Sequence, residues 1–173
     1  MERAGVLPRE TPASPVMLEI LREYIYVFFC SMVPLIELRG AIPIGAAFGL
    51  PWIPNFLISV FGNMLPVPFI LLFIRKILAW MHTTKHFRAI AEWLENKAHS
   101  KSNQVLKYAS FGLMLFVGIP LPGTGAWTGA LIAALLDMRM RYALPSIFAG
   151  ITLAAFIMSG ISYGFLSFLS FLA

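Results

Sequence analysis

Long stretches without ionisable residues dominate the hydrophobic pattern of this chain. These stretches are the membrane candidates, and they cover residues 24–36, 40–74, 108–136 and 142–173. A membrane-spanning helix needs about 20 apolar residues at a rise of about 1.5 Å each. The second stretch is too long for one such helix and too short for two helices with a turn. The pattern therefore predicts interrupted helices.

Prolines set the first interruption. Pro51 and Pro54 divide the second stretch into a short arm over residues 40–50 and a longer arm over residues 55–74. The short arm reaches only about half-way across the hydrocarbon layer, whereas the longer arm can cross it.

The third stretch is interrupted more strongly. Two prolines remove backbone donors, and three small residues directly after them favour a turn; the five are Pro120, Pro122, Gly123, Thr124 and Gly125. Two short arms remain, at residues 108–119 and 126–136. We expect these two arms to be a hairpin that enters the membrane and returns to the same side, and we expect a corresponding hairpin in the first half, ahead of the crossing arm at 55–74.

This architecture occurs twice along the chain. A shift of 85 residues places Arg39-Gly40 over Thr124-Gly125, and interrupted segments at corresponding positions of two halves are typical of transporters built from repeats. We predict an all-α integral membrane protein, an inverted repeat of re-entrant helical hairpin plus transmembrane helix. The expected parts are a polar tail at 1–16 and one membrane domain at 17–173, comprising repeat 1 at about 17–76, an amphipathic linker at about 77–104 and repeat 2 at about 105–173.

Composition supports the membrane assignment. The chain is 59% hydrophobic and only 12% charged, which excludes a soluble enzyme and a nucleic-acid-binding protein. Its net charge of +5 is concentrated between residues 75 and 107, so the positive-inside rule predicts that this basic loop is cytoplasmic in a multi-pass protein. Cys30 is the only cysteine, which leaves no disulfide framework or paired-thiol metal site.

Candidate chemistry lies directly before the short arm at 40–50. Glu37 and Arg39 are ionisable residues inside an apolar stretch, where charge is expensive and marks a functional site by default. We expect Arg39, with the amides that begin at Gly40 and the nearby Pro43, to form a cationic receptor for an anionic group. The opposing break, with Pro120, Pro122, Gly123 and Gly125, is expected to add a second helix N-terminus to the same site.

Glu37 is the candidate for binding the coupling proton or cation, because desolvation favours the neutral form of a carboxyl group. The alternative is that Glu37 and Arg39 neutralise each other or the backbone as a structural clasp.

Further candidates lie beside the receptor. Asn63 is an amide at membrane depth, so it either lines the site or makes an interhelical hydrogen bond. Thr124, Trp127 and Thr128 offer hydroxyl and indole donors beside the second break, with packing the favoured role for Trp127. We expect no metal, no cofactor and no enzymatic activity, because no catalytic set of side chains lies at depth.

Two motifs carry a resemblance to a known family. Residues 37–43 (ELRGAIP) and 119–129 (IPLPGTGAWTG) resemble the prokaryotic small multi-drug export proteins, over nearly all of the chain from about Met17. That family is similar to the DedA and VTT-domain membrane proteins, whose two re-entrant hairpins face one another. The resemblance implies a location in the prokaryotic plasma membrane and movement of lipid carriers or lipids between leaflets, coupled to protons or cations.

Three functions follow as hypotheses. The first is a proton- or cation-coupled secondary transporter, or a flippase, for a small molecule or lipid phosphate whose anionic head binds between the hairpins. The second is an exporter of small cationic drugs, with Glu37, Trp52 and Trp127 as its acid and its aromatic walls. The third is a membrane scaffold or assembly factor. We expect contact with membrane lipid, a homodimer and no nucleic-acid partner.

Overall fold

The computed structural model describes residues 15–83, 103–121 and 123–172, and the parts of the chain that it describes contain helices and no strands. Most of the predicted polar tail and most of the predicted amphipathic linker lie outside the described residues. The first described helix begins at Pro15.

The first half contains a hairpin and a long, bent arm. Its elements are α1 (Pro15–Met32), α2 (Glu37–Ala47), α3 (Trp52–Met64) and α4 (Pro66–Thr83). The short arm was expected at residues 40–50, and this prediction was wrong by about one turn. Glu37 and Arg39 belong to the first turn of α2, because the Gly40 amide donates to the carbonyl of the N-cap residue Ile36 at 3.0 Å.

The second half repeats this order. Its elements are α6 (Asn103–Gly118), α7 (Ala126–Leu135) and α8 (Met140–Leu172). The break between α6 and α7 lies where the prolines and glycines predict it, and the predicted arm at 126–136 is confirmed to within one residue.

The turns that leave the two short helices have the same hydrogen-bond pattern. After α2, the amide of Leu50 donates to the Gly45 carbonyl at 3.0 Å, and after α7 the amide of Met138 donates to the Ala133 carbonyl at 2.9 Å. In both turns the preceding residue has a positive φ, +80° at Gly49 and +48° at Asp137. The two turns are thus 88 residues apart. The shift of 85 residues that aligns the two breaks in the sequence therefore differs by three residues from the shift that aligns these helix ends.

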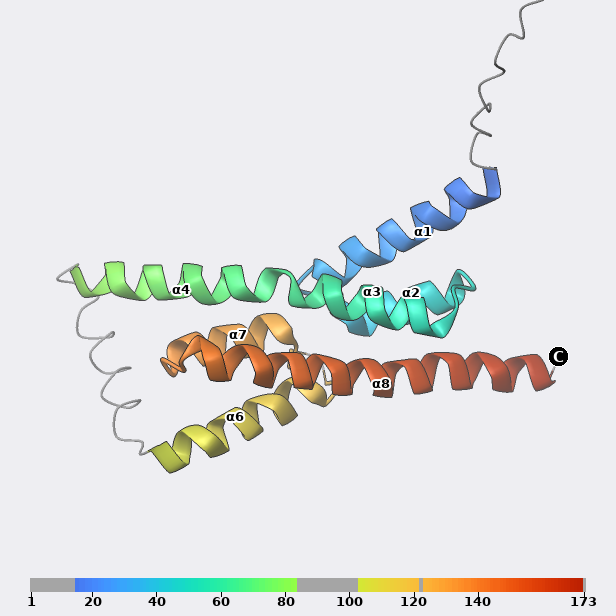
Figure 1. Cartoon of the computed structure of the whole chain (residues 1–173). Coiled ribbons are helices and arrows are strands. Elements are labelled where there is room, and N and C mark those ends of the chain that lie inside the picture. Colours follow the sequence, from blue (N-terminus) through green and yellow to red (C-terminus); the bar gives the residue numbers. More distant parts are fainter. Residues whose placement is uncertain (1–14, 84–102, 122, 173) are drawn as a thin grey trace, which may run out of the picture.

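The two short helices lie end to end in the centre of the molecule (Figure 1). Their N-termini meet in the middle, and their C-termini point to opposite ends of the molecule. At about 1.5 Å per residue, α2 and α7 are about 16 and 15 Å long. Together they extend over about the thickness of a hydrocarbon layer, which is roughly 30 Å.

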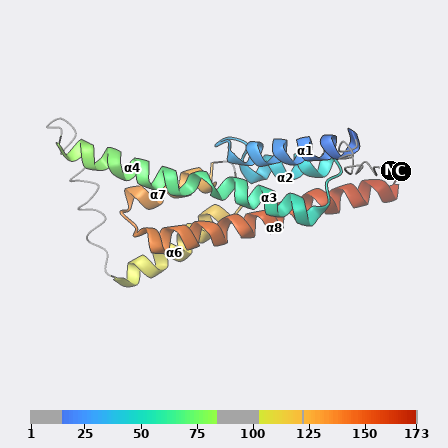
Figure 2. The same ribbon diagram turned by 45° about the horizontal axis from the view of Figure 1, so that its top comes forward.

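Long helices run beside this central pair. The connected helices α3 and α4 run in one direction and α8 runs back in the other, as the two views show (Figures 1 and 2). Among the residues that the structure describes, two segments are long and apolar enough to cross a membrane, Trp52–Ile77 and Met140–Gly164. The described part of the chain is therefore helical with two candidate membrane spans.

Small residues allow the central helices to approach their neighbours. Four alanines of α7 are buried in the main hydrophobic core together with Leu38 and Ile42 of α2; they are Ala126, Ala130, Ala133 and Ala134. In α3, a Cβ atom at Gly62 would overlap the Ser31 hydroxyl and the Phe28 carbonyl of α1. The short helix α2 contacts α3 and α8, and α7 contacts α4 and α8, so both short helices are held by the long ones.

Candidate functional site

The carboxyl group of Glu37 lies where the two short helices meet. Glu37 is the first residue of α2 and is 4% exposed, and its Oε1 accepts a hydrogen bond from the Trp127 amide at 3.4 Å. That amide belongs to the first turn of α7, where unpaired N–H groups and the helix dipole favour negative charge. Glu37 therefore places a carboxylate at the N-terminus of the opposing short helix.

Gly125 makes this approach possible. It is the N-cap residue of α7, and a Cβ atom built on it would overlap both carboxylate oxygens of Glu37. The backbone of Glu37 has a φ of +49°, which is uncommon for a residue with a side chain and is typical of constrained sites. The contact between Glu37 and α7 thus depends on a missing side chain on one partner and an unusual backbone on the other.

Arg39 crosses to the second break. Its Nη2 lies 2.8 Å from both the carbonyl oxygen and the hydroxyl oxygen of Thr124. The same nitrogen is 3.3 Å from the Ile119 carbonyl and 3.5 Å from the Val117 carbonyl, at the C-terminal end of α6, where cations are stabilised. Nη1 lies 3.7 Å from Oε2 of Glu37, which makes a salt bridge between the two side chains.

Thr124 and Trp127 fix the second break from within. The Thr124 hydroxyl lies 2.8 Å from the Ile119 carbonyl and 2.9 Å from the Leu121 carbonyl. The main-chain amide of Trp127 donates to Glu37, and its indole Nε1 donates to the Met32 carbonyl at 3.0 Å. Trp127 therefore connects α7 to the end of α1 as well as to α2, beyond the packing role expected for it.

The structure brings five of the predicted residues together: Glu37, Arg39, Thr124, Gly125 and Trp127. We call this group the clasp. The geometry includes the ion pair and the backbone contacts of the clasp alternative, while the binding of a substrate there stays a prediction.

The remaining predicted residues lie around the clasp or away from it. Gly40 and Pro43 are half-buried in α2, and Thr128 is half-buried in α7. Pro120 is half-buried in the break, whereas Gly123 is exposed with a φ of +81°. Pro122 lies outside the described residues. Asn63 is buried near the end of α3, and no hydrogen bond in the described chain joins it to the clasp.

Sequence reasoning missed a polar pair between α3 and α8. Asn55 Nδ2 donates to the Ile42 carbonyl and to the Tyr163 hydroxyl, both at 2.9 Å, and Tyr163 donates to the Leu50 carbonyl at 2.8 Å. The signal for it was present, because Asn55, Ser59 and Asn63 recur every four residues in an apolar helix and so share one face.

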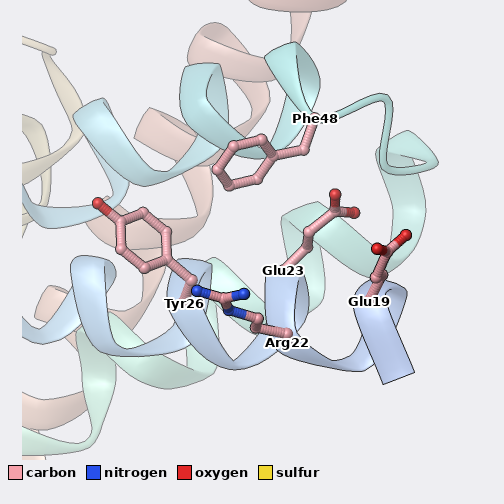
Figure 3. Close-up of a pocket in the computed structure, with 5 residues that line it drawn as sticks. All are labelled: Glu19, Arg22, Glu23, Tyr26 and Phe48. Carbon is pink, nitrogen blue, oxygen red and sulfur yellow. The ribbon is translucent and has the colours of Figure 1, made fainter. Parts of the chain in front are cut away.

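A separate hollow of about 510 Å³ lies beside α1. Its walls carry two acids, one arginine and two aromatic rings, from Glu19, Arg22, Glu23, Tyr26 and Phe48 (Figure 3). The rings of Tyr26 and Phe48 meet edge to face with centroids 5.9 Å apart. The described ranges contain no group of three or more His, Cys, Asp and Glu side chains that could hold a metal ion.

The apolar spans and the clasp between two short helices define a helical membrane protein. The chain belongs to the family described as "Putative small multi-drug export protein", whose match covers residues 37–157. The matched segment begins at Glu37, the first residue of α2, and includes the break between α6 and α7. No curated protein and no solved structure matched the chain.

Proposed function

We propose that this protein is a proton-coupled secondary transporter whose substrate carries an anionic head group. The observation that carries the proposal is the Glu37 carboxylate at the N-terminus of α7, where two short helices meet end to end. An intramembrane acid is costly, and its position at a helix N-terminus is one that an anionic ligand can also occupy.

In this proposal the two hairpins are re-entrant and form an inverted repeat. Three features support this arrangement: the half-membrane lengths of α2 and α7, their opposed directions, and the equal turns 88 residues apart. Backbone breaks at membrane depth are tolerated where they are buried in protein or line a cavity, and the residues that begin the two short helices, Glu37 and Gly125, are buried. The basic segment 75–107 then lies in the cytoplasm of a prokaryotic cell, and a homodimer encloses the site.

Coupling follows from competition for the same amides. While Glu37 is ionised, its carboxylate occupies the N-terminus of α7 and pairs with Arg39. A proton bound by Glu37 removes that negative charge, so the amides of α7 and the guanidinium of Arg39 become available to a phosphate or carboxylate head. Release of the proton restores the carboxylate, which displaces the head group. One proton thus accompanies one anionic charge.

The Glu37→Gln variant tests this coupling. We expect proteoliposomes of the wild-type protein to move a fluorescent lipid phosphate between leaflets faster under an imposed pH gradient. Glu37→Gln keeps the size of the side chain but cannot bind or release the proton, so the response to the gradient should fall at least about tenfold. The measurement is quenching of the fluorescent head group by an impermeant reductant.

Asp137→Asn is the matched control, because Asp137 is an exposed acid in the turn after α7 and asparagine tolerates its positive φ. An equal response to the gradient in wild-type protein and Glu37→Gln would contradict the coupling role of Glu37.

The hollow beside α1 favours a second candidate, export of small cationic drugs. Acidic and aromatic side chains together bind organic cations by charge and by cation–π contact, and the volume lies in the range of small-molecule sites. The family description also refers to drug export.

A double variant separates the two candidates. For cation export, we expect Glu19→Gln with Glu23→Gln to reduce efflux of a cationic dye from cells about tenfold or more, since two charges leave the wall. Glu37→Gln should then have the smaller effect. Unchanged dye efflux in the Glu19/Glu23 double variant would exclude this hollow as the drug site.

A further inference from the structure

A stripe of polar side chains runs along α3 through the protein interior. Asn55, Ser59 and Asn63 are 0%, 0% and 1% exposed, and they follow one another at intervals of four residues. Asn55 Oδ1, Ser59 Oγ and Asn63 Oδ1 each lack a hydrogen-bond partner in the described part of the chain. A buried polar atom without a partner costs free energy, so three in a row on one helix face point to a ligand that satisfies them.

One end of the stripe reaches the turn between α2 and α3. There Asn55 bonds to Tyr163, and Tyr163 donates to the Leu50 carbonyl at the end of that turn. Tyr163 is half-buried, so the stripe approaches the protein surface at this residue. Ser159, one helical turn before Tyr163 on α8, is buried and has an unpaired hydroxyl oxygen as well.

The other end of the stripe lies at the level of the clasp. Asn55 packs against Ile42 and Gly45 in the second half of α2. Because α2 and α3 are joined by a short turn and run in opposite directions, moving eight residues along α3 leads back to the first turn of α2 (Figure 1). Asn63 is therefore level with the start of α2, at Glu37.

We propose that this stripe holds a file of water molecules that carries protons between the α2–α3 turn and Glu37. The spacing fits such a file. Four residues of helix rise by about 6 Å, and one water that bridges two oxygens through hydrogen bonds of about 2.8 Å spans about 5.6 Å. One bridging water per turn thus satisfies Asn55, Ser59 and Asn63 in succession, with two to four polar partners for each buried water.

The file extends the proposed function, because it supplies the proton that Glu37 exchanges. A proton that enters at the Tyr163 end is passed by successive waters, each breaking one O–H bond and forming the next. The last water transfers its proton to the Glu37 carboxylate, which becomes a neutral carboxylic acid. Among the described residues, Arg39 is the charged group that faces Glu37, and α7 contributes the Trp127 main-chain amide.

Infrared spectroscopy of the full-length protein in lipid tests the proposal. After a rapid pH jump, the carboxylic acid band that is absent from Glu37→Gln reports the protonation of Glu37. We expect Asn63→Leu, which is nearly isosteric and apolar, to slow the appearance of this band by about tenfold or more. Ser59→Ala, a milder change, should slow it in the same direction.

Ser31→Ala is the matched control for Ser59→Ala. Ser31 is also 0% exposed, but its hydroxyl already donates to the Phe28 carbonyl at 2.6 Å, and it lies on α1 outside the stripe. We expect it to leave the rate unchanged. Equal rates in wild-type protein, Asn63→Leu and Ser59→Ala would overturn the water file, as would equal slowing in Ser31→Ala.

The measurements distinguish a failure of the water file from a failure of the proposed transport function. If Glu37 protonates at the wild-type rate in the stripe variants while Glu37→Gln abolishes the response to the gradient, the file fails and the transport proposal stands. If the variants slow protonation while Glu37→Gln leaves that response intact, the file stands and the coupling role fails. If no carboxylic acid band of Glu37 appears between about pH 4 and pH 9, the water file is overturned, because Glu37 then does not accept the proton that the file delivers.

Discussion

Replacing Gly125 with alanine should destabilise the protein by on the order of 3 kcal/mol. The added Cβ atom occupies the space of the Glu37 carboxylate, so that carboxylate must leave the N-terminus of α7. Its movement also removes the acceptor for the Trp127 amide and separates Glu37 from Arg39. The measurement is the apparent melting temperature of the purified protein in detergent.

Two comparisons make the Gly125 experiment specific. Gly112→Ala is the control, because a Cβ atom at Gly112 on α6 meets nothing within 4 Å, and alanine favours helix. Adding Glu37→Ala to Gly125→Ala should recover part of the loss, since the smaller side chain removes the overlap. Equal melting temperatures of the Gly125→Ala and Gly112→Ala variants would contradict the contact between Gly125 and Glu37.

The second break was the more predictable part of the fold. Its two prolines and three small residues interrupt a helix for local reasons, so α7 was predicted to within one residue. The first short arm was misplaced by about one turn because its start was set at Gly40, the first residue of the uncharged stretch. Burial of Glu37 against α7 is a tertiary contact, and it allows Glu37 and Arg39 to belong to α2 instead.

The candidate site was predictable in its members but not in their contacts. The cost of charge at depth selected Glu37 and Arg39, and repetition of the breaks placed them near Gly125. That Arg39 would reach the last carbonyls of α6 depends on how closely α2 approaches that helix end. The sequence gives no distance between segments some 80 residues apart, so this acceptor set required the structure.

Arg39→Leu should destabilise the protein by about 3–5 kcal/mol, the largest effect expected for a single side chain here. The leucine donates no hydrogen bond, so the Thr124 hydroxyl and the carbonyls at the end of α6 lose their shared donor. More important, the Glu37 carboxylate stays buried without its counter-charge. Thermal unfolding in detergent measures the effect.

Arg141→Leu is the control for charge loss alone. The guanidinium of Arg141 is exposed and lies over the Tyr142 ring at 4.8 Å from its centroid, a contact of about 0.5–1 kcal/mol. Arg39→Leu should therefore melt well below Arg141→Leu. Equal melting temperatures would show that the Arg39 contacts contribute little.

Combining Arg39→Leu with Glu37→Gln decides what the pair does. Removing both charges leaves no unpaired ion, and a buried ion pair can often be replaced by neutral side chains at little cost in stability. We expect the double variant to recover most of the stability lost in Arg39→Leu.

If the double variant is stable but moves no lipid phosphate, the pair acts in transport. If it is stable and transports normally under a pH gradient, the proposed coupling at Glu37 is wrong. A double variant as unstable as Arg39→Leu would instead assign the clasp to holding α2, α6 and α7 together, as a scaffold requires.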